Sequence, residues 1–349
     1  MQIRQRQRET TQTKSDFMNE FSSFQPEFPY TQAEPLFIKR ANEIKVLRKL
    51  SLLAGSAVLL YVLIQNIIFV FVELFGLLEL YRNNVLFGGG IDILMTILGV
   101  FLPFSLMGGK MKAVSGEAEP VLSEAPDKIH LLIFGAIGAT GLVMLCNIIS
   151  SYITAFISLL GYELASPNIN MPDGVFGFAL SMVRISILTA IVEEYSLRGH
   201  VLGNLRKYGD AFAIFMSAAV FSLMHGNLIQ VPYAMLSGMV LGFFTLKTKS
   251  VWPAIFAHAV CNGLSVIASY LIEIAGEENA LIIYSFVMYA IIFVGLIASF
   301  IFILSTRNRP LRKSESVLKP TEKLFHFLFT PTTLIAFLIM LYITATSVS

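Results

Sequence analysis

The amino-acid sequence predicts an all-α protein, a polytopic transmembrane helix bundle of eight to nine spans with a polar N-terminal tail. The first observation is composition: 55% of the 349 residues are hydrophobic and 14% are charged, whereas typical soluble domains carry about 25% charged residues. The second is a mean hydropathy of +0.71. The third is a series of continuous apolar runs, several of which reach the roughly 20 residues that a membrane span needs.

The chain divides into four parts. Residues 1–46 are rich in Gln, Glu, Arg and Ser; they are predicted to be a disordered cytoplasmic tail that turns helical near 37–50, and they contain no apolar core of a signal peptide. Residues 47–174 and 275–349 are predicted to be transmembrane helices on either side of a catalytic core, residues 175–274. The hydrophobic segments are 47–78, 91–107, 131–160, 175–197, 211–224, 231–246, 251–274, 281–304 and 327–344. Because Pro331 interrupts the ninth, eight spans remain an alternative.

Charges in the connections predict the orientation. Lys and Arg gather in alternate connections, at 40–49, 110–128, 206–207, 247–249 and 307–323, whereas the remaining connections hold Arg82 beside several acidic residues. Under the positive-inside rule this pattern places the N-terminus in the cytoplasm. We therefore expect an integral, multi-pass protein of the cell membrane, with its C-terminus outside if all nine segments cross.

Composition also excludes some partners. The net charge of +2 favours no acidic partner, and no phosphate loop or basic-aromatic pattern for nucleic acid is present. The juxtamembrane lysines and arginines are better interpreted as topology signals and contacts with anionic membrane lipid. Cys146 and Cys261 both fall in apolar runs, which favours buried thiols over a disulfide.

Charged side chains inside a span cost at least about 2.5–3.5 kcal/mol, so they are candidates for function. Glu193, Glu194 and Arg198 close the fourth segment. Glu194 and Arg198 are four residues apart and share a helix face, so they can pair. Glu193 is rotated from them by about 100° and stays free to react. An interfacial charge cluster at a helix end is an equally good interpretation of this motif alone.

Two further motifs follow. His225 ends the fifth segment, and His258 and Asn262 lie four residues apart on one face of the seventh. Alone, His225 would be an interface residue, and the other two would be an interhelical hydrogen-bonding pair. Together with a free carboxylate, however, two imidazoles and an amide are what peptide hydrolysis requires. The carboxylate takes a proton from water, the imidazoles hold the water directly or through a metal, and the amide donates to the oxyanion.

At these residues the sequence resembles the CPBP family (CAAX proteases and bacteriocin-processing enzymes), also called the ABI or type II CAAX prenyl endopeptidase family. The family's ordered motifs read here Glu193-Glu194-Tyr-Ser-Leu-Arg198, Phe221-Ser-Leu-Met-His225 and His258-Ala-Val-Cys-Asn262. The resemblance covers residues 175–268. One departure is Leu197, where the family often has Phe, and it changes packing rather than chemistry.

The resemblance implies an intramembrane endopeptidase that hydrolyses membrane-associated peptides or proteins. Glu193 would activate water, and Asn262 would donate to the oxyanion. His225 and His258 would position the water or bind a divalent metal such as zinc with Glu193. Glu194 and Arg198 would support the site as an ion pair. CAAX processing, bacteriocin processing and self-immunity are all open, and so is a metal-independent mechanism.

The site requires its residues at one depth. Glu193 and His258 are predicted at roughly 7–11 Å from the cytoplasmic side, whereas His225 ends a segment that starts there. We therefore expect segments 211–224 and 231–246 to be short or tilted. Arg184, at mid-span, is expected to pair with Glu73 or with an asparagine such as Asn66 or Asn147.

Two other classes of function compete. A non-catalytic scaffold that regulates a partner, such as a sensor kinase, would tolerate loss of Glu193 and His258. A proton-coupled secondary transporter would use the buried Glu and His for coupling, but such proteins usually have repeated halves. The sequence contains no second copy of either motif, so a transporter ranks last.

Overall fold

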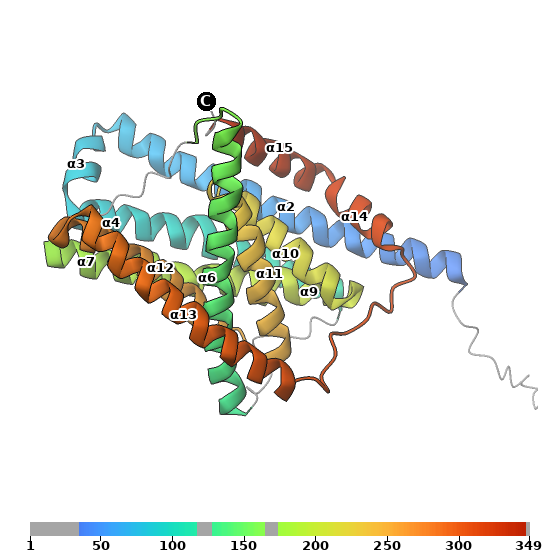
Figure 1. Cartoon of the computed structure of the whole chain (residues 1–349). Helices are drawn as coiled ribbons and strands as arrows, with labels where there is room; N and C mark the ends of the chain where they lie inside the picture. Colours follow the sequence, from blue (N-terminus) through green and yellow to red (C-terminus); the bar gives the residue numbers. More distant parts are fainter. Residues whose placement is uncertain (1–34, 117–127, 165–173, 347–349) are drawn as a thin grey trace, which may run out of the picture. The chain divides into compact units, whose positions relative to one another are not determined.

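A computed structural model describes residues 35–116, 128–164 and 174–346. The predicted disorder of the tail falls almost wholly outside these ranges. The chain separates into two compact units, Met1–Ala41 and Asn42–Ser349, and the site lies in the second. All of the described elements are helices (Figure 1), which confirms the all-α prediction. The division into four parts stays a prediction.

Six helical stretches are long and apolar enough to cross a membrane. They are α2 (Leu36–Leu74), the stretch Val85–Ser115, α6 (Ile129–Leu159), the stretch Gly174–Tyr208, α12 (Trp252–Ala275) and α13 (Glu277–Ser305). A seventh candidate is the pair α14 (Pro320–Leu328) and α15 (Pro331–Ala345), which is bent by 78°. The chain is therefore a multi-pass membrane protein. Within the described residues there are six to seven candidates, so the predicted eight to nine spans are not shown.

The difference in span number arises from two helices, of which one is short. α10 (Asp210–Met224) has 15 residues, a rise of about 22 Å, which is less than the roughly 30 Å of a hydrocarbon core. α11 (Gln230–Thr248) has 19 residues, follows α10 after the connection 225–229 and packs against it. The expectation of a short fifth segment is thus confirmed, and this hairpin explains how His225 returns to the level of the other site residues.

Two of the spanning stretches are composite. Val85–Ser115 consists of α4 (Val85–Leu94), η1 (Met95–Phe101) and α5 (Leu102–Ser115). Gly174–Tyr208 begins with α7 (Gly174–Ser181), η2 (Met182–Leu188) and α8 (Thr189–Glu194), and it continues as η3 (Tyr195–Leu202), α9 (Gly203–Leu205) and η4 (Arg206–Tyr208). A short helix, α3 (Leu78–Asn83), joins α2 to the first of them. Of these segments, η1, η2 and η3 are π-helical.

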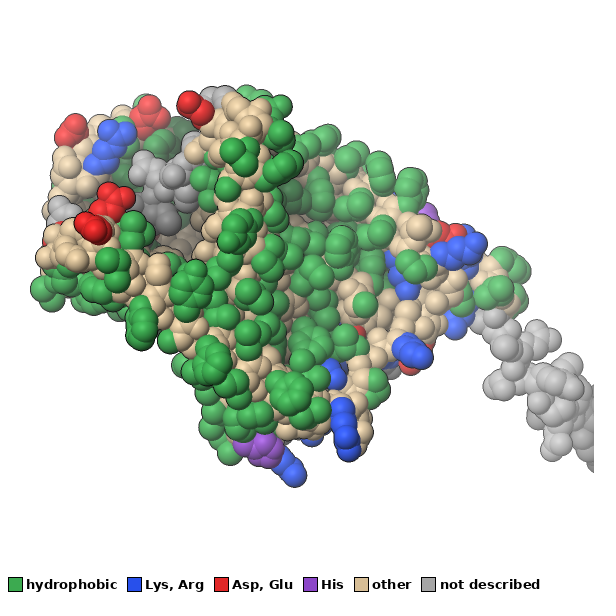
Figure 2. Space-filling view, in the orientation of Figure 1, with side chains coloured by type: hydrophobic (Ala, Val, Ile, Leu, Met, Phe, Trp, Pro, Cys, Tyr) green, Lys and Arg blue, Asp and Glu red, His purple; other side chains and the backbone are tan. Residues whose placement is uncertain are grey.

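The outer surface is largely apolar. Hydrophobic side chains cover most of the face shown in Figure 2, while acidic groups gather at its upper left and Lys and Arg at its lower edge. Leu159 and Phe286 are 85% and 77% exposed, which suits side chains that face lipid. Free Cys146 and Cys261 are buried, as the sequence predicted.

Glycines allow the most extensive helix contact. α6 packs more against α13 than against any other described helix, and the two cross in Figure 1. A Cβ added at Gly295 would lie 2.4 Å from the Cα of Gly141, so the backbones approach more closely than any side chain permits. Small residues at interfaces are the usual basis of helix association in lipid.

A polar cluster joins α2 to the bend between α14 and α15. The Ser51 hydroxyl contacts the carbonyl of Phe327 and lies 2.7 Å from the Thr330 hydroxyl and 2.8 Å from the Thr333 hydroxyl. Pro331, which was expected to interrupt the ninth segment, begins α15 directly after the bend. Ser51 thus supplies a hydrogen-bond partner to backbone and hydroxyl groups at the bend.

Arg184 pairs with a residue other than those expected. Its Nη1 donates to Oδ2 of Asp92, and the Tyr81 hydroxyl donates to the other oxygen of that carboxylate at 2.8 Å. The expectation of Glu73, Asn66 or Asn147 is therefore wrong. The physical reason is that α4 begins at Val85, earlier than the predicted 91, and packs against η2. This places Asp92 beside Arg184.

Candidate active site

The site is built around α8, which lies between the π-helical segments η2 and η3. A π-turn adds a residue to the helical repeat and occurs often at functional sites. Glu193 and Glu194 are the last two residues of α8, and Arg198 lies in η3. The two carboxylates leave the helix in different directions: Glu194 is fully buried, whereas the side chain of Glu193 is 19% exposed.

Glu194 and Arg198 form the predicted ion pair. Arg198 Nη1 donates to Glu194 Oε1 at 2.8 Å, and both side chains are 0% exposed. Arg198 Nη2 also donates to the carbonyl of Gly238 in α11 at 3.2 Å, and the guanidinium lies 4.7 Å from the centre of the Phe221 ring. A charge buried this deeply is tolerated because it is paired and hydrogen-bonded.

Glu194 also fixes the orientation of His258. Its Oε1 lies 2.8 Å from His258 Nδ1, and a carboxylate oxygen can only accept a hydrogen bond, so Nδ1 carries the proton. In the neutral imidazole, Nε2 is then left with a lone pair. That atom lies 3.8 Å from Glu193 Oε2. The supporting carboxylate therefore turns the histidine toward the reactive one.

His225 is oriented by its own helix. It is the C-cap of α10, and its Nδ1 lies 2.9 Å from the carbonyl of Phe221, one turn earlier. The carbonyl can only accept, so Nδ1 is the donor and Nε2 is again left over. The Phe221 ring contacts the imidazoles of His225 and His258 edge-on, with centroids 4.8 and 5.9 Å away. This one ring thus packs against both histidines and Arg198.

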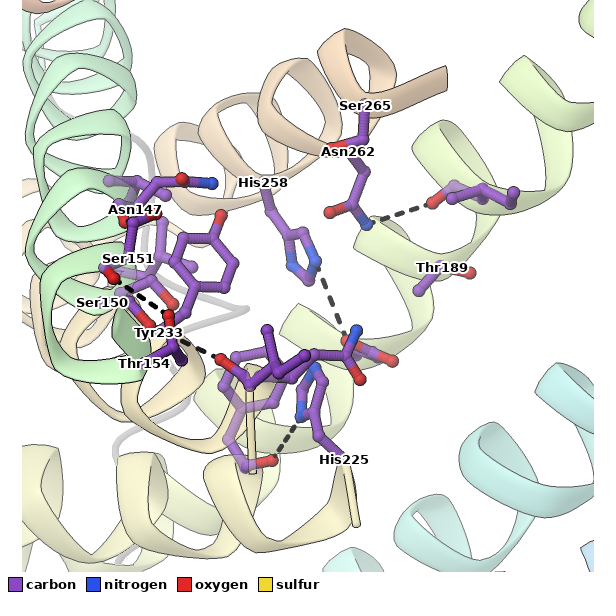
Figure 3. Close-up of a pocket in the computed structure, with 18 residues that line it drawn as sticks. Asn147, Ser150, Ser151, Thr154, Thr189, His225, Tyr233, His258, Asn262 and Ser265 are labelled. Atoms are coloured by element: carbon purple, nitrogen blue, oxygen red, sulfur yellow. Dashed lines mark hydrogen bonds and ion pairs between the residues drawn. The ribbon is translucent and has the colours of Figure 1, made fainter. Parts of the chain in front are cut away.

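Four of the six predicted residues face one cavity of about 520 Å³, which lies within the usual range for ligand pockets. Figure 3 shows His225, His258 and Asn262 pointing into it. Its lining residues are Val143, Asn147, Ser150, Ser151, Thr154, Ile185, Thr189, Glu193, Phe221, His225, Ile229, Gln230, Tyr233, Ser237, Leu241, His258, Asn262 and Ser265. Glu194 and Arg198 lie behind this wall.

Asn262 is engaged at one side. Its Nδ2 donates to the carbonyl of Ile185 at 3.1 Å. Ile185 lies in the π-helical segment η2. An amide nitrogen carries two donors, so one remains for the cavity. The expected interhelical hydrogen bond and the expected cavity position are both present.

Sequence reasoning missed part of the cavity wall. Asn147, Ser150, Ser151 and Thr154 of α6 all face it, although α6 precedes every recognised motif. Their spacing of three, one and three residues places them on one face of a helix, which is a signal that the sequence contained. Gln230, at the start of α11, also lines the cavity and was not singled out.

A metal was the remaining expectation. Glu193, His225 and His258 supply the nitrogen and oxygen donors that zinc prefers. In the parts of the chain that the structure describes, however, no three His, Cys, Asp or Glu residues are close enough to hold an ion. A metal held by Glu193, His225 and His258 therefore stays a prediction.

Comparison with known proteins supports the family resemblance. Residues 175–264 match the family described as type II CAAX prenyl endopeptidase, Rce1-like. The resemblance seen in the motifs is thus confirmed over α7 to α12, where the four cavity residues lie. The chain is also similar to "Putative membrane peptidase YdiL" of Bacillus subtilis (strain 168), with 28% identity over 142 residues.

That similarity covers 40% of this chain and 58% of YdiL, so the match spans little more than half of the relative. No solved structure matches. The Asn147–Thr154 face of α6 lies outside the family match.

Proposed function

We propose that this protein is an intramembrane endopeptidase that hydrolyses membrane-associated peptides or proteins with water activated by Glu193. One observation supports it above the rest: Glu193, His225, His258 and Asn262 line a single cavity. Moreover, each histidine is oriented through Nδ1, which leaves Nε2 for a reactant. The family resemblance supports the same activity.

The mechanism needs one water beside Glu193. The carboxylate accepts a proton from this water while the oxygen attacks the substrate carbonyl carbon. The second hydrogen of this water is donated to Nε2 of one of the two histidines, His225 or His258, and the other imidazole packs beside it. The second N–H of Asn262 donates to the oxyanion. The C–N bond then breaks, and Glu193 returns its proton to the leaving amine, so that water is consumed and no other group is changed.

Glu194 and Arg198 act as positioning residues in this mechanism. Glu194 holds the Nδ1 proton of His258, and Arg198 balances the charge of Glu194. The pair keeps Nε2 of His258 directed at Glu193 without touching the substrate.

We also propose that the N-terminus is cytoplasmic and that the cavity serves substrates near the cytoplasmic face of the cell membrane. The positive-inside pattern of the connections supports this orientation. A catalytic zinc ion held by His225, His258 and Glu193 stays a separate prediction, which would require the three side chains to move closer together. CAAX processing and bacteriocin processing or immunity fit the same chemistry.

The test uses purified protein in liposomes with a quenched-fluorescence library of short peptides, unmodified and prenylated. Wild type is compared with Glu193→Gln and His258→Ala, each with and without a zinc chelator. Loss of at least about 10²-fold in kcat is expected for Glu193→Gln, which is the typical contribution of a general base, and cleavage should also be lost in His258→Ala, because the water loses a partner. The matched control is Glu277→Gln, because Glu277 lies at the exposed start of α13.

The outcomes separate the alternatives. Cleavage lost in both variants and kept in the control supports the peptidase, and sensitivity to the chelator would support zinc. If folded wild type cleaves no peptide while both variants still function in cells, the scaffold is correct. Proton-coupled uptake by wild type that is abolished in Glu193→Gln would favour a transporter.

A further inference from the structure

The cavity wall opposite the recognised motifs is polar without an evident structural need. Most of the residues that line the cavity carry hydrogen-bonding side chains, although α6 is one of the candidate membrane spans. Polar groups in a span are costly unless they have partners or face a water-filled cavity. The side chains on this wall that have no internal partner are therefore candidates for binding a ligand.

The hydroxyl groups of α6 are already bonded within the protein. Ser151 donates to the carbonyl of Asn147 at 3.0 Å, and Thr154 donates to the carbonyl of Ser151 at 3.0 Å. Ser150 donates to the carbonyl of Ile229 at 3.5 Å. These serines and this threonine return their hydrogen bonds to backbone, as such residues usually do in membrane helices.

The two amides of the wall differ from these hydroxyls. Neither the Asn147 nor the Gln230 side chain hydrogen-bonds to another described residue. Figure 3 shows Asn147 extending from α6 on the side of the cavity occupied by Tyr233. Gln230 lines this cavity and also a neighbouring one of about 230 Å³, and Glu193 and His225 border both.

A side-chain amide offers a donor and an acceptor at fixed spacing, and so does a peptide group. A substrate segment in a membrane is helical, because a helix satisfies its backbone groups internally. Cleavage requires an exposed scissile carbonyl, so the helix must unwind around that bond. The neighbouring N–H and C=O groups then need partners, because an unsatisfied peptide group in an apolar medium costs roughly 2–7 kcal/mol. Free amides that line the same cavity as the attacking carboxylate are suited to supply them.

We propose that Asn147 and Gln230 bind the main chain of the substrate beside Glu193, so that the cavity takes a short extended peptide segment largely irrespective of its side chains. This inference rests on the proposed peptidase function and names its substrate class. Asn147 and Gln230 hold the segment in place, while the chemistry belongs to Glu193 and the two histidines.

The test removes the same hydrogen bond twice, once by changing the peptide and once by changing the protein. A peptide that wild type cleaves in liposomes is resynthesised with single ester links, each of which replaces one N–H next to the scissile bond with oxygen. At one or more positions the ester is expected to lower kcat/KM of wild type about tenfold, as loss of one hydrogen bond in a site can do. Asn147→Leu and Gln230→Met should each lose about tenfold with the all-amide peptide.

The two losses should not add. In the variant that lacks the partner amide, the matching ester should cost less than about twofold, because the bond is already absent. Asn66→Leu is the matched control, since Asn66 is an exposed amide on α2 that donates to its own helix, and it should keep wild-type ester sensitivity. Asn147→Ser is the second variant if Asn147→Leu does not fold.

The inference is overturned if the variants cleave the amide peptide at the wild-type rate. It is also overturned if they lose activity but retain the full tenfold ester effect at every position, which would indicate a structural role. A folded wild type that cleaves no peptide at all would overturn the proposed function itself, and this outcome is visible before any ester is tested.

Discussion

The buried pair of Glu194 and Arg198 allows a quantitative test of how the site is held. At 2.8 Å and an effective dielectric constant of about 20, the attraction between the two charges is roughly 6 kcal/mol. Burial of both groups offsets much of this gain. Removing one partner alone leaves an uncompensated charge, which costs about 3–5 kcal/mol.

We therefore expect Glu194→Leu and Arg198→Met each to lower the free energy of unfolding by about 3–5 kcal/mol. The double variant should lose about 3 kcal/mol less than the sum of the two, because it contains no unpaired charge. The hydrogen bond of Arg198 to Gly238 and its contact with the Phe221 ring are absent from both Arg198→Met and the double variant. Their contribution therefore cancels in the cycle.

The assay is reversible unfolding in mixed micelles, with peptide cleavage measured in parallel. Cleavage by the folded double variant should stay low as well, since His258 Nδ1 has lost its acceptor. Losses that add to within about 0.5 kcal/mol would refute the reasoning, because the pair would then not be energetically coupled. Full cleavage by the double variant would refute the positioning role of Glu194.

Three further predictions concern other parts of the molecule. Asp92→Leu should lower the free energy of unfolding in micelles by about 2 kcal/mol, because Arg184 loses its carboxylate partner; an unchanged value would show that solvent or lipid replaces it. Gly295→Ala should cost about 1–3 kcal/mol in the same assay by separating α6 from α13, whereas Gly90→Ala, which meets nothing within 4 Å, should cost nothing. Asn262→Ala should lower kcat about 10²-fold with little change in KM; a change confined to KM would assign it to substrate binding instead.

Much of the site could be predicted because its residues obey helical spacing. The separation of four between Glu194 and Arg198 predicted their ion pair, and the same spacing placed His258 and Asn262 on one face. The position of His225 required a second argument, that segment 211–224 is short. α10 agrees with it.

The parts that could not be predicted depend on contacts between distant segments. Asp92 is the second residue of a predicted apolar segment, and nothing local shows that α4 packs against η2. Asn147 was expected to partner Arg184, but it faces the cavity instead. The predicted eight to nine spans are not shown by the described helices, because hydropathy alone does not distinguish helices such as α10 and α11 from full crossings.

The Ser51 cluster has a consequence for the synthesis of this protein. Ser51 and its partners Phe327, Thr330 and Thr333 are separated by 276 to 282 residues of chain. At about 5–20 residues per second, a ribosome needs roughly 14 to 56 s to make that stretch. During this interval the Ser51 hydroxyl lacks these three partners. α2 therefore enters the bilayer early but reaches its final packing only when the bend between α14 and α15 has emerged.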